Sequence, residues 1–164
     1  MSTAIKAEVR QGSGSTQVVV FQLGREFYAV SISDVREIVR MQSITPVPSA
    51  PDYVQGVVNL RGQVIPVINL AKRLGLPVQP ATPATRIVVA QAGQDTVGVI
   101  VDSVVKVTHI PGEDIEVPEA LARQGAEFSH ITGIAKVEDG LITLIDLEHA
   151  ISFASTPGQA QRNP

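Results

Sequence analysis

An approximate internal duplication constrains the fold of this chain more than any other feature of its sequence. The segment VVVFQLGREFYAVSISDV, residues 18–35, aligns without a gap with IVVAQAGQDTVGVIVDSV, residues 87–104. In both copies an apolar run leads to a glycine (Gly24 or Gly93), an acidic turn residue and a second apolar run. Further along, VQGVVNLRGQVIPVINL (residues 54–70) matches ITGIAKVEDGLITLIDL (residues 131–147). We interpret the pattern as a two-lobed architecture with a pseudo-repeat. The alternative is chance similarity among Val-rich hairpins.

Each copy predicts a hairpin, an irregular segment and a second hairpin. Tyr28, Val30 and Ile32 alternate with smaller or polar neighbours, as in a strand with one buried face. Val and Ile dominate the 44% of apolar residues, and β-branched side chains favour pleated surfaces. Many short strands separated by turn residues predict a mainly β protein, built as small closed barrels or a sandwich.

The turn residues also predict the element boundaries. The predicted hairpins pair strands 17–23 with 27–32, 56–60 with 63–69, 86–92 with 96–101, and 131–137 with 141–146. Further strands are predicted at 39–44 and 104–109, and short helices at 71–74, 118–124 and 147–154. Asp34 and Glu37 have the spacing of a helix N-cap and its third residue, which predicts one helical turn after Asp34.

Composition divides the chain into a folded part and two polar ends. We predict a flexible leader over residues 1–16, a folded domain over 17–155 and a flexible tail over 156–164, because neither end has enough apolar surface to offset its ordering entropy. Within the folded part, the first barrel is expected at about 17–75 and the second at about 85–150, with the helix 147–154 packing back. The Pro-rich linker 76–84 separates the two copies.

Charge and cysteine content exclude several classes of partner. The net charge is −3 and basic residues are scattered, which argues against nucleic acid and against an anionic membrane surface. The chain has no cysteine, and its N-terminus lacks the pattern of a signal peptide. No apolar stretch reaches the roughly 20 residues of a membrane helix. The simplest prediction is a cytoplasmic protein without direct membrane insertion.

The sequence offers little catalytic chemistry. His109, His130 and His149 do not share the spacing of metal ligands, so we predict no metal site. No serine lies in a G-x-S-x-G turn, and no phosphate-binding loop is present. The carboxylate groups at 113–116 and 138–139 fall in predicted turns, where solvation opposes acid–base roles. We therefore predict no enzymatic activity and no cofactor.

The stretch QGVVNLRGQVIPVINL, residues 55–70, is apolar on both sides of a charged turn. Arg61 lies in that turn directly before Gly62, where its guanidinium can pair with a carboxylate or contact a partner. The alternative is a solvated turn residue.

This stretch resembles the CheW family of chemotaxis coupling proteins. The family motif G-V-x-N-L-R-G-x-x-x-P-V-x-x-L is present as Gly56, Val57, Asn59, Leu60, Arg61, Gly62, Pro66, Val67 and Leu70. Other blocks follow in the family's order: F-x-L-G-x-x-x-Y at 21–28, V-x-E-I at 35–38, V-G-V-I-V-D at 97–102 and I-T-G-I-A-K-V at 131–137. The resemblance covers roughly residues 17–153.

The resemblance implies a fold, a function and partners. It implies two small five-stranded β-barrels packed together and no catalytic activity. It implies an adaptor that couples chemoreceptors (methyl-accepting chemotaxis proteins) to the CheA histidine kinase in bacterial chemotaxis signal transduction, a two-component system. The expected partners are a CheA-type histidine kinase and the cytoplasmic hairpin tip of a chemoreceptor. The expected location is the cytoplasm, at membrane receptor arrays.

The resemblance also nominates site residues. For receptor binding these are Val35, Glu37, Gly56, Arg61, Ile87 and Val107, and for kinase binding Ile32 and Val39. For Val35, Ile87 and Val107 the alternative is an ordinary core role, and Gly56 is expected to be needed by the backbone. Two other functions stay open at this point: an adaptor of another chemosensory pathway, such as twitching motility or second-messenger control, and an unrelated two-barrel ligand-binding or hydrolytic domain.

Overall fold

The computed structural model describes residues 14–123, 130–138 and 140–151, which form a mainly β structure. The strands are β1 Ser15–Leu23, β2 Glu26–Ser31, β3 Val35–Arg40, β4 Val54–Leu60, β5 Gln63–Asn69, β6 Arg86–Ala92, β7 Asp95–Val101, β8 Ser103–Pro111, β9 Ile115–Glu116, β10 Ile131–Val137 and β11 Gly140–Ile145. The short helices are α1 Leu70–Arg73, α2 Glu119–Ala122 and α3 Leu147–Ala150, with 3-10 turns η1 Ile32–Asp34 and η2 Gly112–Asp114.

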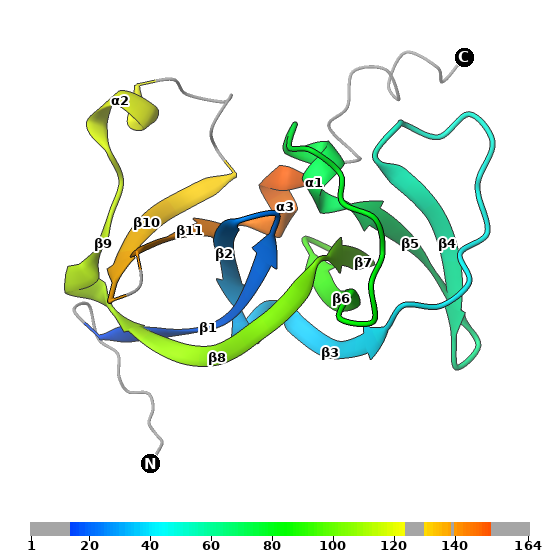
Figure 1. Ribbon diagram of the computed structural model, residues 1–164, viewed down its shortest axis with the longest axis horizontal. Helices are drawn as coiled ribbons and strands as arrows, with labels where there is room; N and C mark the ends of the chain where they lie inside the picture. The colour runs from blue at the N-terminus through cyan, green and yellow to red at the C-terminus, as the bar shows by residue number, and fades with distance from the viewer. Residues whose placement is uncertain (1–13, 124–129, 139, 152–164) are drawn as a thin grey trace.

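The strands form two curled sheets that lie next to each other (Figure 1). One sheet has the order β8-β1-β2-β11-β10-β9, and the other has the order β3-β6-β7-β5-β4. The predicted fold class, two small β-barrels with short helices, is confirmed. The larger sheet has six strands because the two-residue β9 adds to the edge of β10 through Ala135 and Ile115.

The strand pairing differs from the predicted division into barrels at 17–75 and 85–150. The hairpin β1–β2 pairs with β8 and, in parallel, with β11, so it belongs to the sheet of the second copy. The hairpin β6–β7 likewise joins β3 and β5 of the first copy. The six-stranded sheet therefore combines the first hairpin of the first copy with later strands of the second copy. The five-stranded sheet combines the first hairpin of the second copy with later strands of the first copy. The two hairpins present equivalent edges, so the exchanged pairing satisfies the same hydrogen bonds, and the local sequence pattern does not distinguish the two arrangements.

This exchange explains the continuous apolar runs in β1 and β6. In β1, Val18 and Val20 point into the six-stranded sheet, whereas Val19 and Phe21 point into a cluster between the sheets. Successive strand residues point to opposite faces, so a strand buried on both faces must be apolar throughout. We call the three buried groups the six-strand cluster, the five-strand cluster and the central cluster. The central cluster joins both sheets and includes residues of α1 and α3.

Two local predictions were wrong. No helical turn follows Asp34, because η1 ends there and β3 begins at Val35. The strand predicted at 39–44 is shifted to Val35–Arg40, where half-buried and exposed residues alternate as one-sided burial requires. The residues after Asp34 form a strand and not a helix. The β-branched side chains of Val35, Ile38 and Val39 favour the extended conformation of a strand.

The predicted termini are only partly within the described residues. Ser15 and Thr16 belong to β1, so the predicted leader overlaps the first strand, whereas residues 1–13 and the tail 156–164 lie outside the described part. The helix predicted at 118–124 covers Glu119–Ala122. The helix predicted at 147–154 covers Leu147–Ala150, and residues 152–154 lie outside the described part.

Candidate functional site

The NLRG turn joins β4 to β5 and holds Arg61 in an unusual backbone conformation. Arg61 has a φ of 50°, and Gly62, which follows it, has a φ of 87°. The side chain of Asn59 stabilises the turn, because its Oδ1 accepts a hydrogen bond of 2.9 Å from the Gly62 N–H. Consecutive left-handed residues make a tight hairpin turn that projects the Arg61 side chain beyond the sheet.

Arg61 forms an ion pair with Glu37 of β3, which is far from the turn in sequence. The Arg61 side chain is 70% exposed and that of Glu37 is 32% exposed. Because β3 and β4 are the two edge strands of the five-stranded sheet, the pair connects opposite edges of that sheet. It borders a depression lined by Arg36, Glu37, Leu60, Arg61, Gln63, Ile65, Val89 and Thr96. An exposed pair of this kind contributes little to stability, so its charges remain available to a partner.

Gly56, the third residue of β4, allows the strand to approach the backbone of the preceding loop closely. It is buried, its φ is 151°, and it marks a β-bulge between β4 and β5. A Cβ atom at this position would overlap the carbonyl oxygen of Thr45 and lie 2.8 Å from Cγ2 of Ile44. Thr45 exchanges two backbone hydrogen bonds with Val57, so the loop before β4 depends on this close approach.

Three predicted apolar site residues lie on or beside β3 and are half-buried. Val35 and Ile32 pack against the central cluster, and Val39 packs against the five-strand cluster. Each therefore contributes to a core and keeps part of its surface exposed.

Ile87 and Val107 differ from each other. Ile87, on β6 opposite Val39, is fully buried in the five-strand cluster, so its side chain is a core residue with no surface for a partner. Val107 is 50% exposed on β8, where it pairs with Val19 of β1. Of the two, only Val107 presents an apolar surface to solvent.

Exposed apolar side chains continue beyond the predicted positions. Ile38 on β3 and Val105 on β8 are also exposed, with Arg36 and Arg40 on the outward face of β3 and Lys106 between the two valines. Figure 1 shows that β8 and β3 follow one another along one edge of the molecule. We call this set, Ile38, Val105 and Val107, the apolar row. Sequence reasoning missed Ile38 and Val105, although both break the alternation expected of one-sided strands.

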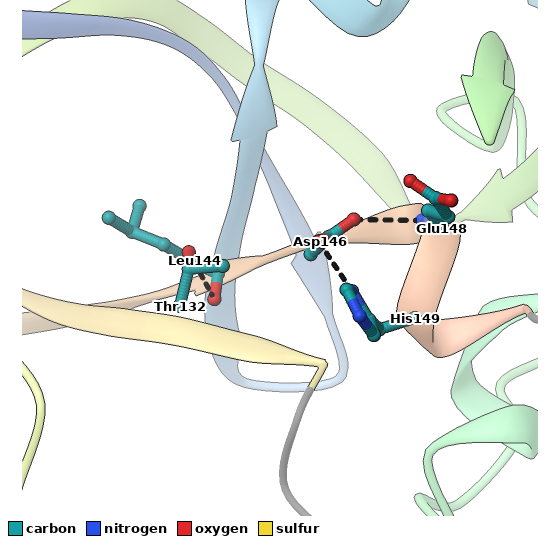
Figure 2. Close-up of polar contacts among 5 residues, drawn as sticks. All are labelled: Thr132, Leu144, Asp146, Glu148 and His149. Carbon is teal, nitrogen blue, oxygen red and sulfur yellow. Dashed lines mark hydrogen bonds and ion pairs between the residues drawn. The ribbon is translucent and has the colours of Figure 1, made fainter. Parts of the chain in front are cut away.

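A second hollow lies at the junction of the two sheets. It is lined by Thr16, Val18, Ala29, Ser31, Asp34, Gln91, Gly93, Thr132, Leu144, Ile145, Asp146 and Glu148. Figure 2 shows how Asp146 begins α3: its Oδ1 accepts a hydrogen bond of 2.9 Å from the Glu148 N–H, and its Oδ2 lies 2.7 Å from Nδ1 of His149. Thr132 Oγ1 donates to the Leu144 carbonyl at 3.4 Å.

Three carboxylates meet in this junction hollow. Burial raises the pKa of Asp34, and the negative charges of Asp146 and Glu148 raise it further. The groups facing Asp34 from other elements include the neutral Gln91 of β6, whose Oε1 accepts a hydrogen bond from Arg36. Ionised Asp34 is thus disfavoured in the folded chain relative to the unfolded chain.

We expect Asp34→Asn to stabilise the protein near neutral pH. Because the folded-state pKa is raised, protonated Asp34 favours folding at low pH, and this contribution is lost as pH rises through the folded-state pKa. The neutral amide removes the repulsion, with a gain of about 0.5 kcal/mol after solvent screening. Urea unfolding of both proteins should show the largest difference at about pH 7 and almost none below about pH 3, where Asp34 is protonated in both states.

Asp114→Asn is the matched control for this variant. Asp114 is the last residue of η2, as Asp34 is of η1, so the substitution removes the same formal charge from the same helix position. The control should not reproduce the pH-dependent gain. Equal pH profiles for the two variants would show that general charge, rather than the junction, is responsible.

The remaining titratable groups provide no metal centre within the described residues, where no group of three His, Cys, Asp or Glu side chains is arranged to hold an ion. His109 and His149 are exposed, and burial together with Arg73 lowers the pKa of His130. Glu113 and Glu116 are exposed, and Glu116 pairs with Lys136. Among the helices described, none is long and apolar enough to span a membrane.

Comparisons with known proteins agree with this geometry. The family model of the CheW-like domain matches residues 17–154. The chain is 37% identical to the probable chemotaxis protein CheW of Rhizobium etli over 163 residues, covering 98% of this chain and 99% of that protein. It is 35% identical to the chemotaxis protein CheW of Bacillus subtilis over 158 residues, covering 94% and 99%. The crystal structure of the scaffolding protein TtCheW from Thermoanaerobacter tengcongensis superposes with a TM-score of 0.77 at 35% identity, covering 87% of this chain and 96% of that one.

Proposed function

This chain belongs to the family of CheW-like domains, and from that membership we propose that it is a non-enzymatic adaptor that couples chemoreceptors to a CheA-type histidine kinase in bacterial chemotaxis. The observation that supports this role most directly is the apolar row along β8 and β3, together with the exposed Glu37–Arg61 pair, whose Glu37 precedes Ile38 in β3. Relatives named as chemotaxis proteins, and a solved relative named as a scaffolding protein, support the same role. We place the protein in the cytoplasm, at receptor arrays.

We propose that the receptor tip docks on the apolar row. An amphipathic helix of a receptor hairpin fits an apolar strip with charged borders, because its apolar face covers the strip and its polar residues meet the charges. Val107 and Ile38 supply apolar surface, Val35 contributes its exposed part, and Glu37 and Arg61 supply charge. Gly56 and Ile87 have structural roles, Gly56 where β4 approaches the loop at Thr45 and Ile87 in the core behind β3.

We propose that the kinase docks on the five-stranded sheet. Val39 and Ile32 are half-buried at its β3 side, and Val64 is 63% exposed on β5 of the same sheet. The residues proposed for the kinase differ from those proposed for the receptor, so one chain can hold both partners. The adaptor then shifts the kinase between conformations only as far as its affinity for them differs. Weak single contacts suffice in an array, where repeated binding adds avidity.

Arg61→Glu should weaken receptor-stimulated autophosphorylation of the kinase and leave the fold intact. The substitution places two carboxylates side by side where an ion pair stood, and it reverses the charge offered to the receptor. We expect activation to fall about tenfold, since close charged contacts at interfaces contribute roughly 1–3 kcal/mol. The measurement is kinase autophosphorylation in a reconstituted complex of receptor, kinase and adaptor.

The double variant Glu37→Arg with Arg61→Glu separates two explanations. It restores an ion pair with the charges exchanged, so a purely structural pair predicts full recovery. Direct recognition of Arg61 by the receptor predicts that activation stays low. Normal activation by the single variant would remove Arg61 from the docking surface. A pull-down in which the wild-type chain retains neither the kinase nor the receptor tip would refute the adaptor function itself.

A further inference from the structure

The described chain passes between the two sheets at two places. The first crossing is η1, residues Ile32–Asp34, which leads from β2 into β3. The second is the single residue Asp102, between the end of β7 at Val101 and the start of β8 at Ser103. The strands that follow the two crossings, β3 and β8, are the strands that bear the apolar row.

Asp102 is fixed to the opposite sheet by two hydrogen bonds. Its backbone N–H donates to the carbonyl of Gln22 at 3.0 Å, and its Oδ2 accepts from the N–H of Gly24 at 2.6 Å. Gln22 closes the same turn, because its Nε2 donates to the Gly24 carbonyl at 2.9 Å. Asp102, which connects the two sheets, is therefore hydrogen-bonded to the region of the β1–β2 turn through both its backbone and its side chain.

The other crossing has no comparable clamp among its side-chain contacts in the described structure. The Ser31 hydroxyl accepts from the Ser33 N–H, which is a local bond, and Asp34 faces two carboxylates that repel it. A hydrogen bond from a backbone N–H to a carboxylate is stronger than one between two neutral groups. Asp102 therefore adds a side-chain clamp at the point where β8 leaves β7, beyond the pairing of β8 with β1.

We propose that Asp102 is a positioning residue for receptor docking: it fixes β8 relative to β3 and so sets the spacing between Val107 and Ile38. This inference rests on the proposed docking of the receptor along both strands. Apart from Ile32 in η1, the proposed kinase surface lies on β3 and β5 of the five-stranded sheet, and neither strand is bonded to Asp102. Loss of the clamp should therefore separate the two binding activities.

The test uses the full chain with Asp102→Ala, Asp102→Asn and the control Asp95→Ala. Alanine removes the acceptor for the Gly24 N–H, whereas asparagine keeps a side-chain oxygen that can accept it. Asp95 is an exposed residue at the start of β7, so its substitution removes the same charge without touching the crossing. Binding to a soluble receptor-tip fragment and to the CheA-type histidine kinase is measured for each protein.

For Asp102→Ala we expect the affinity for the receptor tip to fall about tenfold and the affinity for the histidine kinase to change less than about twofold. Asp95→Ala should bind both partners as the wild type does, and Asp102→Asn, which keeps a weaker neutral acceptor, should lose less receptor-tip affinity than Asp102→Ala. Equal losses for both partners, or an Asp102→Asn variant as defective as Asp102→Ala, would overturn the proposal. If Asp102→Ala does not fold, Asp102→Ser, which keeps a polar group too short to reach Gly24, takes its place.

A distance measurement tests the positioning claim independently of any partner. The chain has no cysteine, so spin labels introduced through Val64→Cys and Leu141→Cys, both exposed and one in each sheet, attach only at these two positions. The label-to-label distance distribution should be narrow when Asp102 is retained and in the Asp102→Asn variant, and broader or displaced in Asp102→Ala. An unchanged distribution in Asp102→Ala would refute the inference. Failure of the wild type to bind the receptor tip, with the broadening present, would instead refute the proposed function.

Discussion

Gly56→Ala is expected to lower the free energy of unfolding by about 3 kcal/mol, because the added methyl group has no space. The nearest atoms are the Thr45 carbonyl group and the Ile44 Cγ2 atom, and the first of these is backbone. The two hydrogen bonds between Thr45 and Val57, at 2.9 and 2.8 Å, prevent that backbone from moving away without loss of both. The φ of 151° adds strain for any residue with a Cβ atom.

Two other glycines provide graded controls for this prediction. Gly62 has a φ of 87° and no atom within 4 Å of an added Cβ, so Gly62→Ala should cost about 1 kcal/mol from backbone strain alone. Gly133 occupies the position equivalent to Gly56 in the second copy, and its added Cβ would meet the Ile115 side chain at 2.6 Å. A side chain can rotate away, so Gly133→Ala should fall between the other two.

Urea unfolding of the three variants measures these differences. If Gly56→Ala unfolds at the same urea concentration as Gly62→Ala, then the close approach of Gly56 to Thr45 does not contribute to the free energy of unfolding. In that case a receptor-binding defect of a Gly56 variant would indicate direct contact. The expected order makes Gly56 a requirement of the loop before β4, so such a defect would follow from loss of structure.

The hairpins of this fold were predictable because their signal is local. Apolar alternation and turn glycines placed β6 and β10 at their observed residues, and Gly24 and Gly93 at the turns. Both turns also use the same contact, in which Gln22 or Gln91 donates to the carbonyl of the glycine two residues on. Local periodicity, however, does not specify which hairpin pairs with which.

The exchange of hairpins between the sheets was not predictable for that reason. Val67 pairs with Gly98 and Leu144 pairs with Ala29, which are equivalent parallel contacts in the two sheets. A chain that keeps its hairpins within one copy has the same local pattern. The selection between the two depends on the short crossings η1 and Asp102 and on the central cluster, which are long-range features.

The candidate site was also predictable only where the signal is local in the sequence. The sequence indicated Arg61 and Glu37, and the structure shows that they pair with each other. It did not separate core from surface among the apolar positions, because Ile87 and Val107 are both β-branched residues in β-rich segments. Whether a side chain is buried depends on which other elements cover its strand, and that arrangement is known only from the packed structure.

Ile87→Ala and Val107→Ala should therefore have opposite effects on stability and on receptor binding. Ile87 is fully buried, and its Cγ2 lies over Gly98, a residue with no side chain to fill a cavity. We expect Ile87→Ala to lower the free energy of unfolding by about 3 kcal/mol. Val107 is 50% exposed, so Val107→Ala should change stability by less than about 0.5 kcal/mol.

Receptor binding is expected to reverse this order. Val107→Ala removes apolar surface from the apolar row, and we expect a roughly fivefold weaker complex with the receptor tip, about 1 kcal/mol. Ile87→Ala, assayed where it remains folded, should bind within about twofold of the wild type, because its side chain does not reach the surface. Urea unfolding and titration with the receptor tip measure the two quantities on the same samples. A folded Ile87→Ala protein with a larger receptor defect than Val107→Ala would mean that the core behind β3, rather than the exposed row, determines docking.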